Sequence, residues 1–418
     1  MDYQISEKIK DIFEKTIALP AVADAIDRIQ ADHPFSMEEH TALVLCEAPT
    51  FHEQERAKLF AEKLTEYGLA DVRIDDDGNV WGIRKGTGNG PVILTEAHMD
   101  TVFPFGSVKE LRDEDGVLYA PGAIDNTRGM TALLAVLRAM NKAQIRTKGD
   151  IIFCGTSREE GMGSLGGMRD FLEHGPKVDA SISVDGADTE AITCEATGYR
   201  TDEVNFYGIG GHAYSAFGEM ANPLHAAARA VAKIADFQVS ADPKTTFCVS
   251  NFHAGNDAGV HAIVPKATIK FNIRSNDQAL LDELEARVYR AVQEACDEET
   301  ARWGKDTITW DSKRFCEVPA GKQDRHAPLV EAAVAAALHF TPEQKRQNVA
   351  IRDGGCVNGN MAIGRGVPCV TIGGGSLNCC IHSTDEYFPY AQAYALPQEV
   401  LTLLCMAAGV DGAVEPLF

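Results

Sequence analysis

The sequence lacks the features that mark membrane proteins and nucleic-acid-binding proteins. No run of eighteen apolar residues occurs among the 418 residues, and the N-terminal segment MDYQISEKIKDIFEK is charged, without the apolar core of a signal peptide. Lysine and arginine total 39 against 61 acidic residues, so the formal net charge is −22 and a nucleic acid would be repelled. We therefore expect a soluble, cytoplasmic protein that binds neither membranes nor nucleic acids.

Regular cysteine spacing is also missing. The 11 cysteines form no CxxC pair and no repeated spacing. An odd number of cysteines without an export signal indicates reduced thiols, and most of them lie in apolar runs such as IIFCGTS and VPCVTIG. We therefore expect the cysteines to pack as small apolar side chains.

Short apolar runs that end in polar residues alternate with helical patterns along much of the chain. Three such runs are VILTEAHMD (92–100), DIIFCGTSREE (150–160) and ASISVDG (180–186). After Asp125, apolar residues recur with helical spacing and fall on one face: Met130, Leu133, Leu134, Leu137 and Met140. This alternation predicts a fold of the α/β class, with a parallel sheet covered by helices.

The pattern changes at about residue 200 and returns at about residue 315. The intervening segment begins with TDEVNFYGIGGHA and continues with a helix opened by Asn222 and Pro223, the strand-like ATIKFNIRS and a long helix from Asp277 to about Glu299. We therefore predict an α+β module at 199–314, inserted into a first domain made of residues 1–198 and 315–418.

Residues with titratable side chains follow the predicted strands. His98 and Asp100 end the first run, and because alternate residues of a strand point to the same side, Asp100 would orient the His98 imidazole or lie beside its metal ion. The later apolar segments end in further acids or a histidine: Asp125, Glu159, Glu160, Asp185 and His382. Strand ends in α/β sheets commonly bind ligands, so these side chains form the candidate site. For His98 alone, a hydrogen-bonded structural histidine is the alternative.

The adjacent carboxylates of Glu159 and Glu160 point to cations in this site. Two carboxylates buried at a strand end are costly unless cations compensate them or one of them holds a proton. Two Zn²⁺ ions would balance three ligand carboxylates and a bridging hydroxide, with the histidines as neutral ligands. Mixed nitrogen and oxygen donors favour zinc, are compatible with manganese or cobalt, and do not suit an all-oxygen magnesium site. A structural hydrogen-bond network is the alternative.

At these residues the sequence resembles a known family. The segments that carry the resemblance are TEAHMDTVFP, GAIDNTRGM, TSREEGMGS, SVDGA, GIGGHAYS, FNIRS and HSTDEYF, in the order and with the spacing of that family. It is the family of co-catalytic zinc exopeptidases and amidohydrolases that includes peptidase T, acetylornithine deacetylase, aminoacylase and glutamate carboxypeptidase. The resemblance implies a three-layer catalytic domain with a central mixed sheet, plus an inserted α+β, ferredoxin-like lid that forms a dimer.

The resemblance also implies a role for each residue of the candidate site. His98 and Asp185 would bind one zinc ion, Glu160 and His382 the other, and Asp125 would bridge both. Asp100 would support His98 from behind. Glu159 would be the general base that takes a proton from the attacking water and delivers it to the leaving amine.

Two residues of the predicted lid match residues that contact the substrate in the family. His212 in GIGGHAYS would stabilise the oxyanion, in the family often across the dimer. Arg274 in FNIRS would bind a substrate carboxylate, for which a planar bidentate donor is suited. The alternatives are a turn histidine and an exposed strand arginine.

The chain departs from the family in a glycine loop and in a lid strand. Peptidase T-like members have arginine, two glycines, threonine and aspartate, where this chain reads RDGGCVN at 352–358 and lacks the last aspartate. This change puts the amino-terminal preference of a tripeptidase in doubt, and Asp353 or Asn358 would replace the missing contact. The substrate-binding candidates of the loop are Arg352, Asp353, Gly354, Gly355 and Asn358. In the lid, AGNDAGVHAIVP lacks an asparagine that many relatives carry just before the proline, and we assign that role to no residue.

Other enzyme classes have weaker support. Residues 161–166 form a GxGxxG pattern with Asp185 about twenty residues on, as in NAD-binding oxidoreductases, but Glu159 and Glu160 would repel a pyrophosphate there. No serine lies in GxSxG, and HExxH fails because His52-Glu53-Gln54-Glu55 is followed by Arg56. A non-catalytic metal-binding protein on the same scaffold would be expected to lose Glu159.

The reaction we predict is hydrolysis of a peptide or similar amide bond in a small substrate. We favour a di- or tripeptide exopeptidase over an N-acyl-amino-acid deacylase because RDGG and HSTDEYF are closer to peptidase T than to the deacetylases. The predicted cofactors are two Zn²⁺ ions per chain, and the predicted assembly is a homodimer formed through the lid.

Overall fold

The computed structural model describes residues 3–88, 90–303, 308–374 and 379–418. The chain divides into two compact units, residues 1–196 with 322–418 and residues 197–321. The second unit extends beyond 199–314 because its outer boundaries are set by two long strands, β10 (Gly198–Tyr207) and β15 (Thr309–Val318), which pair with each other.

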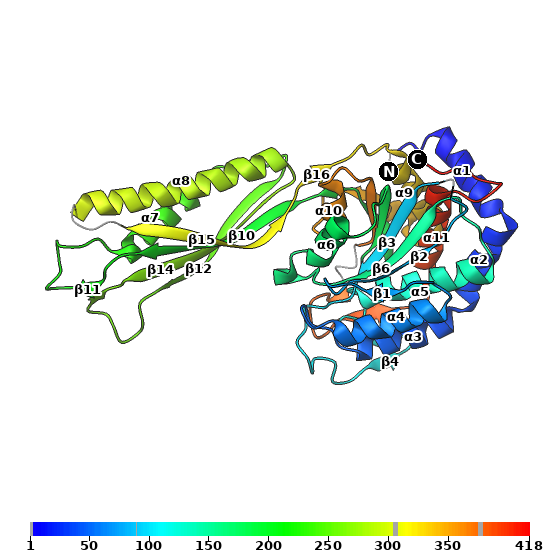
Figure 1. The fold of residues 1–418 in the computed structure, drawn as a ribbon, viewed down its shortest axis with the longest axis horizontal. Helices are drawn as coiled ribbons and strands as arrows, with labels where there is room; N and C mark the ends of the chain where they lie inside the picture. Colours follow the sequence, from blue (N-terminus) through cyan, green and yellow to red (C-terminus); the bar gives the residue numbers. More distant parts are fainter. Residues whose placement is uncertain (1–2, 89, 304–307, 375–378) are drawn as a thin grey trace. The chain divides into compact units, whose positions relative to one another are not determined.

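A mixed eight-stranded sheet forms the centre of the first unit (Figure 1). In spatial order its strands are β1 (Arg73–Ile74), β2 (Val80–Arg84), β6 (Asp150–Thr156), β3 (Val92–His98), β7 (Ala180–Val184), β18 (Cys369–Gly373), β8 (Asp188–Thr193) and β17 (Ala350–Arg352). As the apolar runs predict, β3 pairs in parallel with both β6 and β7. By contrast, β2 runs antiparallel to β6, and β18 antiparallel to β8, which confirms the mixed sheet that the resemblance implies.

Helices cover both faces of this sheet, so the unit has three layers. On one face lie α5 (Thr127–Lys142), α9 (Pro328–Phe340) and α11 (Ala395–Ala408), and on the other α6 (Gly166–His174) and α10 (Gly359–Ile363) (Figure 1). Outside the first face lie α1 (Glu7–Ala18), α2 (Pro20–Ala31) and α3 (His33–Leu45), while α4 (Gln54–Glu66) packs on β1 and β2. The five apolar residues predicted on one face of α5 are all buried.

The start of α5 lies close to the end of β7. Asn126 caps the helix, because its Oδ1 accepts a hydrogen bond of 3.0 Å from the Gly129 amide while its Nδ2 donates to the Val184 carbonyl at 2.7 Å. A Cβ atom at position 129 would lie 2.6 Å from the Val184 oxygen, so only glycine permits this approach. The helix therefore holds Asp125 against the carboxyl end of β7.

The second unit has the chain order βαββαβ. Its four-stranded antiparallel sheet has the order β12 (Thr245–Ala254), β14 (Lys266–Ser275), β10 and β15, and α7 (Pro223–Ala235) and α8 (Gln278–Trp303) pack against β10 and β14. This is a ferredoxin-like arrangement. A small sheet of β11 (Gly211–His212) and β13 (Ala262–Ile263) completes the unit.

The remaining short elements belong mostly to loops near the sheet. They are β4 (Arg112–Glu114), β5 (Val117–Tyr119), β9 (Glu195–Ala196), β16 (Gly321–Lys322), β19 (Tyr387–Pro389), and the 3₁₀ turns Gly161–Gly163 and Glu343–Asn348. None of the helices within the described part of the chain combines the length and the apolar character that crossing a bilayer requires.

Candidate active site

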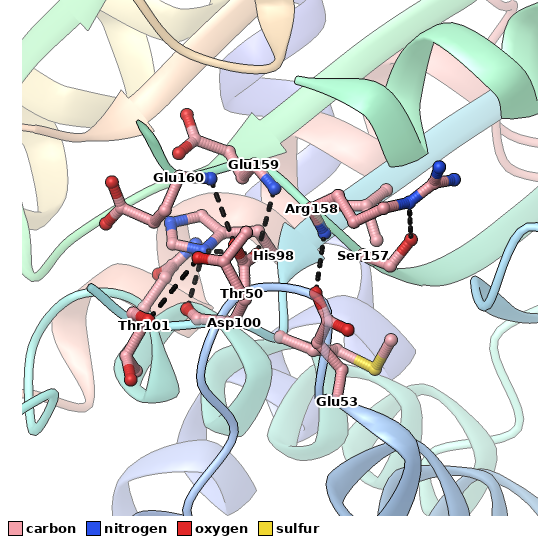
Figure 2. Close-up of polar contacts among 12 residues, drawn as sticks. Thr50, Glu53, His98, Asp100, Thr101, Ser157, Arg158, Glu159 and Glu160 are labelled. Atoms are coloured by element: carbon pink, nitrogen blue, oxygen red, sulfur yellow. Dashed lines mark hydrogen bonds and ion pairs between the residues drawn. The ribbon is translucent and has the colours of Figure 1, made fainter. Parts of the chain in front are cut away.

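The carboxyl ends of the parallel strands meet at one edge of the central sheet, where they surround a cavity of about 190 Å³. The side chains predicted at strand ends gather there. The residues that line the cavity are His98, Asp125, Glu159, Glu160, Asp185, Gly186, Thr193, Cys356, Val357, Thr371, Gly373, Gly374, Ile381 and His382. The structure thus brings together six of the seven predicted acids and histidines, and the seventh, Asp100, lies directly behind His98 (Figure 2).

His98 has a defined tautomer in this site. Its Nδ1 donates a hydrogen bond of 3.0 Å to the backbone carbonyl of Asp100, so the neutral ring presents the lone pair of Nε2 to the cavity. Nε2 lies 2.9 Å from Asp125 Oδ1 and 3.8 Å from Asp185 Oδ1. This arrangement orients a metal-binding imidazole from behind.

Asp125 lies between two histidines. Its Oδ1 faces His98, and its Oδ2 lies 2.9 Å from Nε2 of His382, which is also 3.1 Å from Glu160 Oε1. Oδ1 is buried, yet it accepts no hydrogen bond from any residue that the structure describes. A carboxylate oxygen that lies 2.9 Å from an imidazole nitrogen needs a proton or a cation between the two atoms, and a divalent cation would also compensate the neighbouring carboxylates.

Two overlapping groups of side chains have the spacing of metal ligands. One consists of His98, Asp125 and Glu160, the other of His98, Glu159 and Asp185, and in each group the ligand atoms all lie within 4.8 Å of one another. Nitrogen and oxygen donors in this proportion suit zinc, manganese or cobalt. The donor set therefore fits divalent cations.

The protonation equilibria of the site reflect its excess of acids. Burial raises the pKa of Glu159 well above its usual value; the His98 charge opposes this shift, and Glu160 and Asp185 add to it. Burial alone would lower the pKa of His98, but the carboxylates around it raise it instead. Hydrogen bonds to Asp125 and Glu160 raise the pKa of His382 to about 10. Divalent cations would reverse these shifts, because they neutralise the carboxylates.

Glu386 holds the loop that carries Asp125. Its carboxylate is fully buried and accepts hydrogen bonds from the amides of Gly122 at 2.9 Å, Ile124 at 2.6 Å and Asp125 at 3.2 Å. Burial raises the pKa of Glu386 to about 7. The HSTDEYF segment thus positions Asp125 through Glu386 as well as contributing His382. Sequence reasoning missed this role, although the segment itself was singled out.

The glycine loop lies beside the cavity, but the predicted residues are not the ones that line it. Arg352 and Asp353 are exposed, and Asp353 forms a 2.7 Å ion pair with Arg325. Gly354 and Gly355 are half-buried, and Asn358 is only 3% exposed. Between them, Cys356 and Val357 line the cavity. The predicted substrate contacts of this loop stay predictions, and Cys356 and Val357 join the candidates.

The two predicted lid residues lie in the second unit. His212 is exposed at the end of β11, and its Nδ1 accepts hydrogen bonds from the amides of Tyr214 at 3.2 Å and Ser215 at 3.4 Å. In the neutral ring the proton is therefore on Nε2, which makes this nitrogen a donor. Arg274 is exposed on β14, where its guanidinium stacks on Tyr199 and Nε donates to Asn272.

The GxGxxG pattern has a structural explanation in the same loop. Gly161 has a φ of +51°, in the left-handed region that favours glycine, and a Cβ atom at Gly163 would lie 2.5 Å from the Arg158 carbonyl oxygen. Small residues are required here because the turn after β6 folds back on its own backbone. The pattern therefore gives no support to a dinucleotide site.

Imidazoles and carboxylates around a shared aspartate, at the edge of an α/β sheet, are the donor set of a metal-dependent hydrolase. Residues 94–406 match the profile of peptidase family M20/M25/M40, and the chain belongs to that family. It is thus a metal-dependent hydrolase of peptide or related amide bonds.

The similar proteins include a desuccinylase and two peptidases. The chain is 27% identical over 368 residues to a succinyl-diaminopimelate desuccinylase of Xanthomonas oryzae pv. oryzae, with 83% of this chain and 92% of the relative covered. Among solved structures, it resembles a tripeptidase of Staphylococcus aureus (TM-score 0.70, 22% identity, 89% and 97% covered). It also resembles aminopeptidase PepT of Bacillus cereus (TM-score 0.71, 21% identity, 89% and 97% covered).

Proposed function

We propose that this protein is a cytoplasmic exopeptidase that removes residues from di- or tripeptides, as an aminopeptidase does, with two zinc ions bound in each chain. The observation that carries the proposal is the position of Asp125 between two imidazoles, with one carboxylate oxygen toward His98 and the other toward His382. A carboxylate placed in this way is suited to bridge two cations.

The residues that would hold the ions are those that the family resemblance implies, and their distances support this assignment. His98 and Asp185 would bind one ion, Glu160 and His382 the other, and Asp125 both. Manganese or cobalt would use the same donors. Asp100 would keep His98 in the metal-binding tautomer through the hydrogen bond at Nδ1.

Glu159 is the proton carrier of the proposed reaction. When bound, the cations would polarise the scissile carbonyl and lower the pKa of the attacking water. Glu159 would accept a proton from that water and deliver it to the leaving amine. Burial raises the pKa of Glu159, and the neighbouring charges of Glu160 and Asp185 add to this shift, so the site favours a carboxyl group that can hold the proton between the two transfers. The wall formed by Thr193, Cys356 and Val357 would hold the substrate beside this carboxylate.

His212 would stabilise the oxyanion of the tetrahedral intermediate. Its Nε2 is free to donate because Nδ1 is occupied by two backbone amides. We propose that the second unit forms a homodimer and that His212 acts in the partner subunit's site. Strand β12 supports this role, since it lies at the edge of its sheet, where a strand of a second copy can pair with it.

A peptide suits the cavity better than an acidic acyl group. None of the described residues that line the cavity is a lysine or an arginine, so this wall offers no cation to an acyl carboxylate. A neutral side chain and a peptide ammonium group do not need one. In the proposed dimer, the exposed guanidinium of Arg274 would bind the C-terminal carboxylate of the peptide.

The second candidate is an N-acyl-amino-acid deacylase. It is favoured by the desuccinylases that are 26% to 28% identical to this chain. The bond broken and the proposed role of Glu159 are the same in both candidates, so they differ only in the group on the acyl side.

A hydrolysis screen separates the two. The zinc-loaded protein is incubated with dipeptides, tripeptides, N-acetyl amino acids and N-succinyl amino acids, with a chelated sample as control, and products are identified by mass spectrometry. We expect chelator-sensitive release of amino acids from the peptides. Cleavage of the N-succinyl compounds alone would replace the exopeptidase by the deacylase, and no cleavage at all with both metal ions bound would contradict both.

A further inference from the structure

Glu53 is a buried carboxylate that the proposed mechanism does not use. It directly precedes helix α4 but forms no capping hydrogen bond with it, and it is only 5% exposed. Instead, its Oε1 accepts hydrogen bonds of 3.0 Å from the amide of Phe51 and of 3.0 Å from the amide of Arg158 (Figure 2). This second hydrogen bond joins the start of α4 to the residue before Glu159.

The backbone amides of three consecutive residues, 158–160, donate hydrogen bonds to buried carboxylates in the loop after β6, which we call the catalytic loop. Glu53 accepts the Arg158 N–H, while Asp100 accepts the Glu159 N–H with Oδ1 and the Glu160 N–H with Oδ2, each at 3.0 Å (Figure 2). In an extended strand, consecutive amides point to opposite sides and could not all meet carboxylates on one side. The loop therefore leaves the strand geometry at Arg158.

The backbone of Arg158 shows how this happens. Its φ of +53° lies in the left-handed region, which side-chain-bearing residues seldom adopt. A turn of this kind brings successive N–H groups together into an anion-binding concavity. Because an isolated arginine disfavours this conformation, the surrounding contacts must hold it, and the Glu53 carboxylate accepts the N–H of this very residue.

Burying Glu53 at this position is unfavourable by itself. Burial raises the pKa of Glu53, and the neighbouring Asp100 charge adds to the effect. The guanidinium of Arg56 is buried nearby, but it donates to the carbonyls of Cys46 and Met99 and not to Glu53. Glu53 is nevertheless buried beside the Asp100 carboxylate, where it accepts a hydrogen bond from the backbone amide of Arg158. This arrangement indicates a role beyond packing.

We propose that Glu53 is a positioning residue of the active site: it fixes the left-handed turn at Arg158 and thereby the direction in which Glu159 and Glu160 enter the cavity. Glu53 touches no substrate atom and acts only through the backbone. The inference rests on the proposed role of Glu159 as general base. Displacement of a catalytic group by about 1 Å can reduce turnover about 100-fold, which sets the size of the expected effect.

Two substitutions of similar volume separate the hydrogen bond from packing. Glu53→Gln keeps an oxygen that can accept the Arg158 N–H, whereas Glu53→Met fills the space and accepts nothing. Glu55→Ala is the matched control, because Glu55 is on the same helix turn, has a side chain that is 74% exposed and pairs only with Lys58 among the described residues. All variants are assayed as the full, zinc-saturated chain.

The expected results concern exchange and turnover. In Glu53→Met, amide hydrogen exchange in peptides that span 157–161 should accelerate at least about tenfold, and kcat should fall about 100-fold with KM changed less than about threefold. Glu53→Gln should restore both quantities to near the wild-type values, and Glu55→Ala should match the wild type. Slow exchange of the Arg158 amide in the wild type, comparable with those of Glu159 and Glu160, is a further expectation that requires no variant to fold.

Several results would overturn the proposal. A Glu53→Met protein that melts at a lower temperature but keeps its kcat well below that temperature would make Glu53 a purely structural residue. Unchanged exchange at 157–161, or fast exchange of the wild-type Arg158 amide, would remove the turn from the argument. Glu159→Gln is assayed in parallel: if it is inactive while Glu53→Met is fully active, only the positioning role fails, whereas an active Glu159→Gln refutes the proposed base.

Discussion

The side-chain amide of Asn358 donates a hydrogen bond of 2.8 Å to Oε2 of Glu96, which lies two residues before His98 on β3. The same amide group lies 2.7 Å from Thr156 Oγ1 on β6, to which it also donates. Asn358 therefore ties the glycine loop to the two strands that end in the active site. The segment of the loop that lines the cavity, Cys356 and Val357, directly precedes this anchor.

Replacing Asn358 by alanine should destabilise the protein. The substitution removes both hydrogen bonds and leaves the buried Glu96 carboxylate with fewer donors, which costs about 2 kcal/mol of the free energy of unfolding. Chemical denaturation measures the difference. Asp353→Ala, which removes an exposed ion pair in the same loop, should change the stability by less than about 0.5 kcal/mol. Equal effects of the two substitutions would contradict the anchoring role.

Asp125→Ala should reduce metal binding at both proposed positions. One carboxylate oxygen faces His98 and the other faces His382, so its loss removes a ligand from each ion. Metal content after dialysis, measured by plasma mass spectrometry, should fall from two ions to less than one per chain. Asp385→Ala, at an exposed position near His382, serves as the control and should retain both ions. Retention of two ions in Asp125→Ala would exclude a bridging role.

Glu159→Gln should inactivate the protein without removing its metal. The amide has the shape of the carboxylate but accepts no proton at neutral pH, so kcat should fall about 10²–10⁴-fold. The Glu159 amide hydrogen bond to Asp100 does not depend on the side chain, so the fold of the loop should persist. Turnover and metal content are measured on the same sample. Near-normal kcat with full metal content would exclude Glu159 as the base.

The residues of the site could be predicted because of a topological rule. Parallel strands present their carboxyl ends at one edge of a sheet. The residues at these ends must therefore approach one another once the strands are recognised: His98 at the end of β3, Glu159 and Glu160 after β6, and Asp185 after β7. The helix after Asp125 was equally readable, because its apolar residues recur with helical spacing and face the core.

Contacts that depend on loop geometry could not be predicted in this way. Asn358 lies three residues after Gly355, and the sequence does not show that its side-chain amide points inward toward Glu96. Glu53 lies in a segment that resembles HExxH but lacks its second histidine. Its hydrogen-bond partner is the backbone amide of Arg158, 105 residues further along the chain, and no sequence motif encodes such a contact. The edges of the second unit also differ from the prediction, because β15 continues to Val318 without a change in composition.

Mixing two inactive homodimers tests whether His212 acts in the partner subunit. In a mixed dimer of Glu159→Gln and His212→Ala chains, one site would combine an intact Glu159 with an intact His212 from the other chain. After complete subunit exchange, half of the dimers are mixed, so about a quarter of the wild-type activity should return. Exchange is followed with differently tagged chains. Proven exchange without recovered activity would place His212 in its own subunit's site or outside catalysis.

The pH dependence of stability should change when Glu399 is replaced by glutamine. Glu399 is buried in α11, and neither of its carboxylate oxygens has a hydrogen-bond partner among the described residues. Burial raises the pKa of Glu399 well above its usual value, and the charge of Glu190 adds to the shift. The folded protein therefore keeps this proton at a pH where the unfolded chain releases it.

The sign of the effect follows from proton linkage. Below about pH 4.3 the side chain of Glu399 is protonated in both the folded and the unfolded state, so its titration does not change the free energy of unfolding. Above that pH the unfolded chain binds fewer protons than the folded protein, so the free energy of unfolding falls as pH rises. Glu399→Gln removes this loss, by up to about 1.4 kcal/mol for each pH unit until the folded pKa is reached. Urea denaturation at pH 5 and pH 7 should show a gain over the wild type that is larger at pH 7. Glu38→Gln, at an exposed position, should show the same difference from the wild type at both pH values. A gain for Glu399→Gln that does not grow with pH would mean that Glu399 is already ionised in the folded protein.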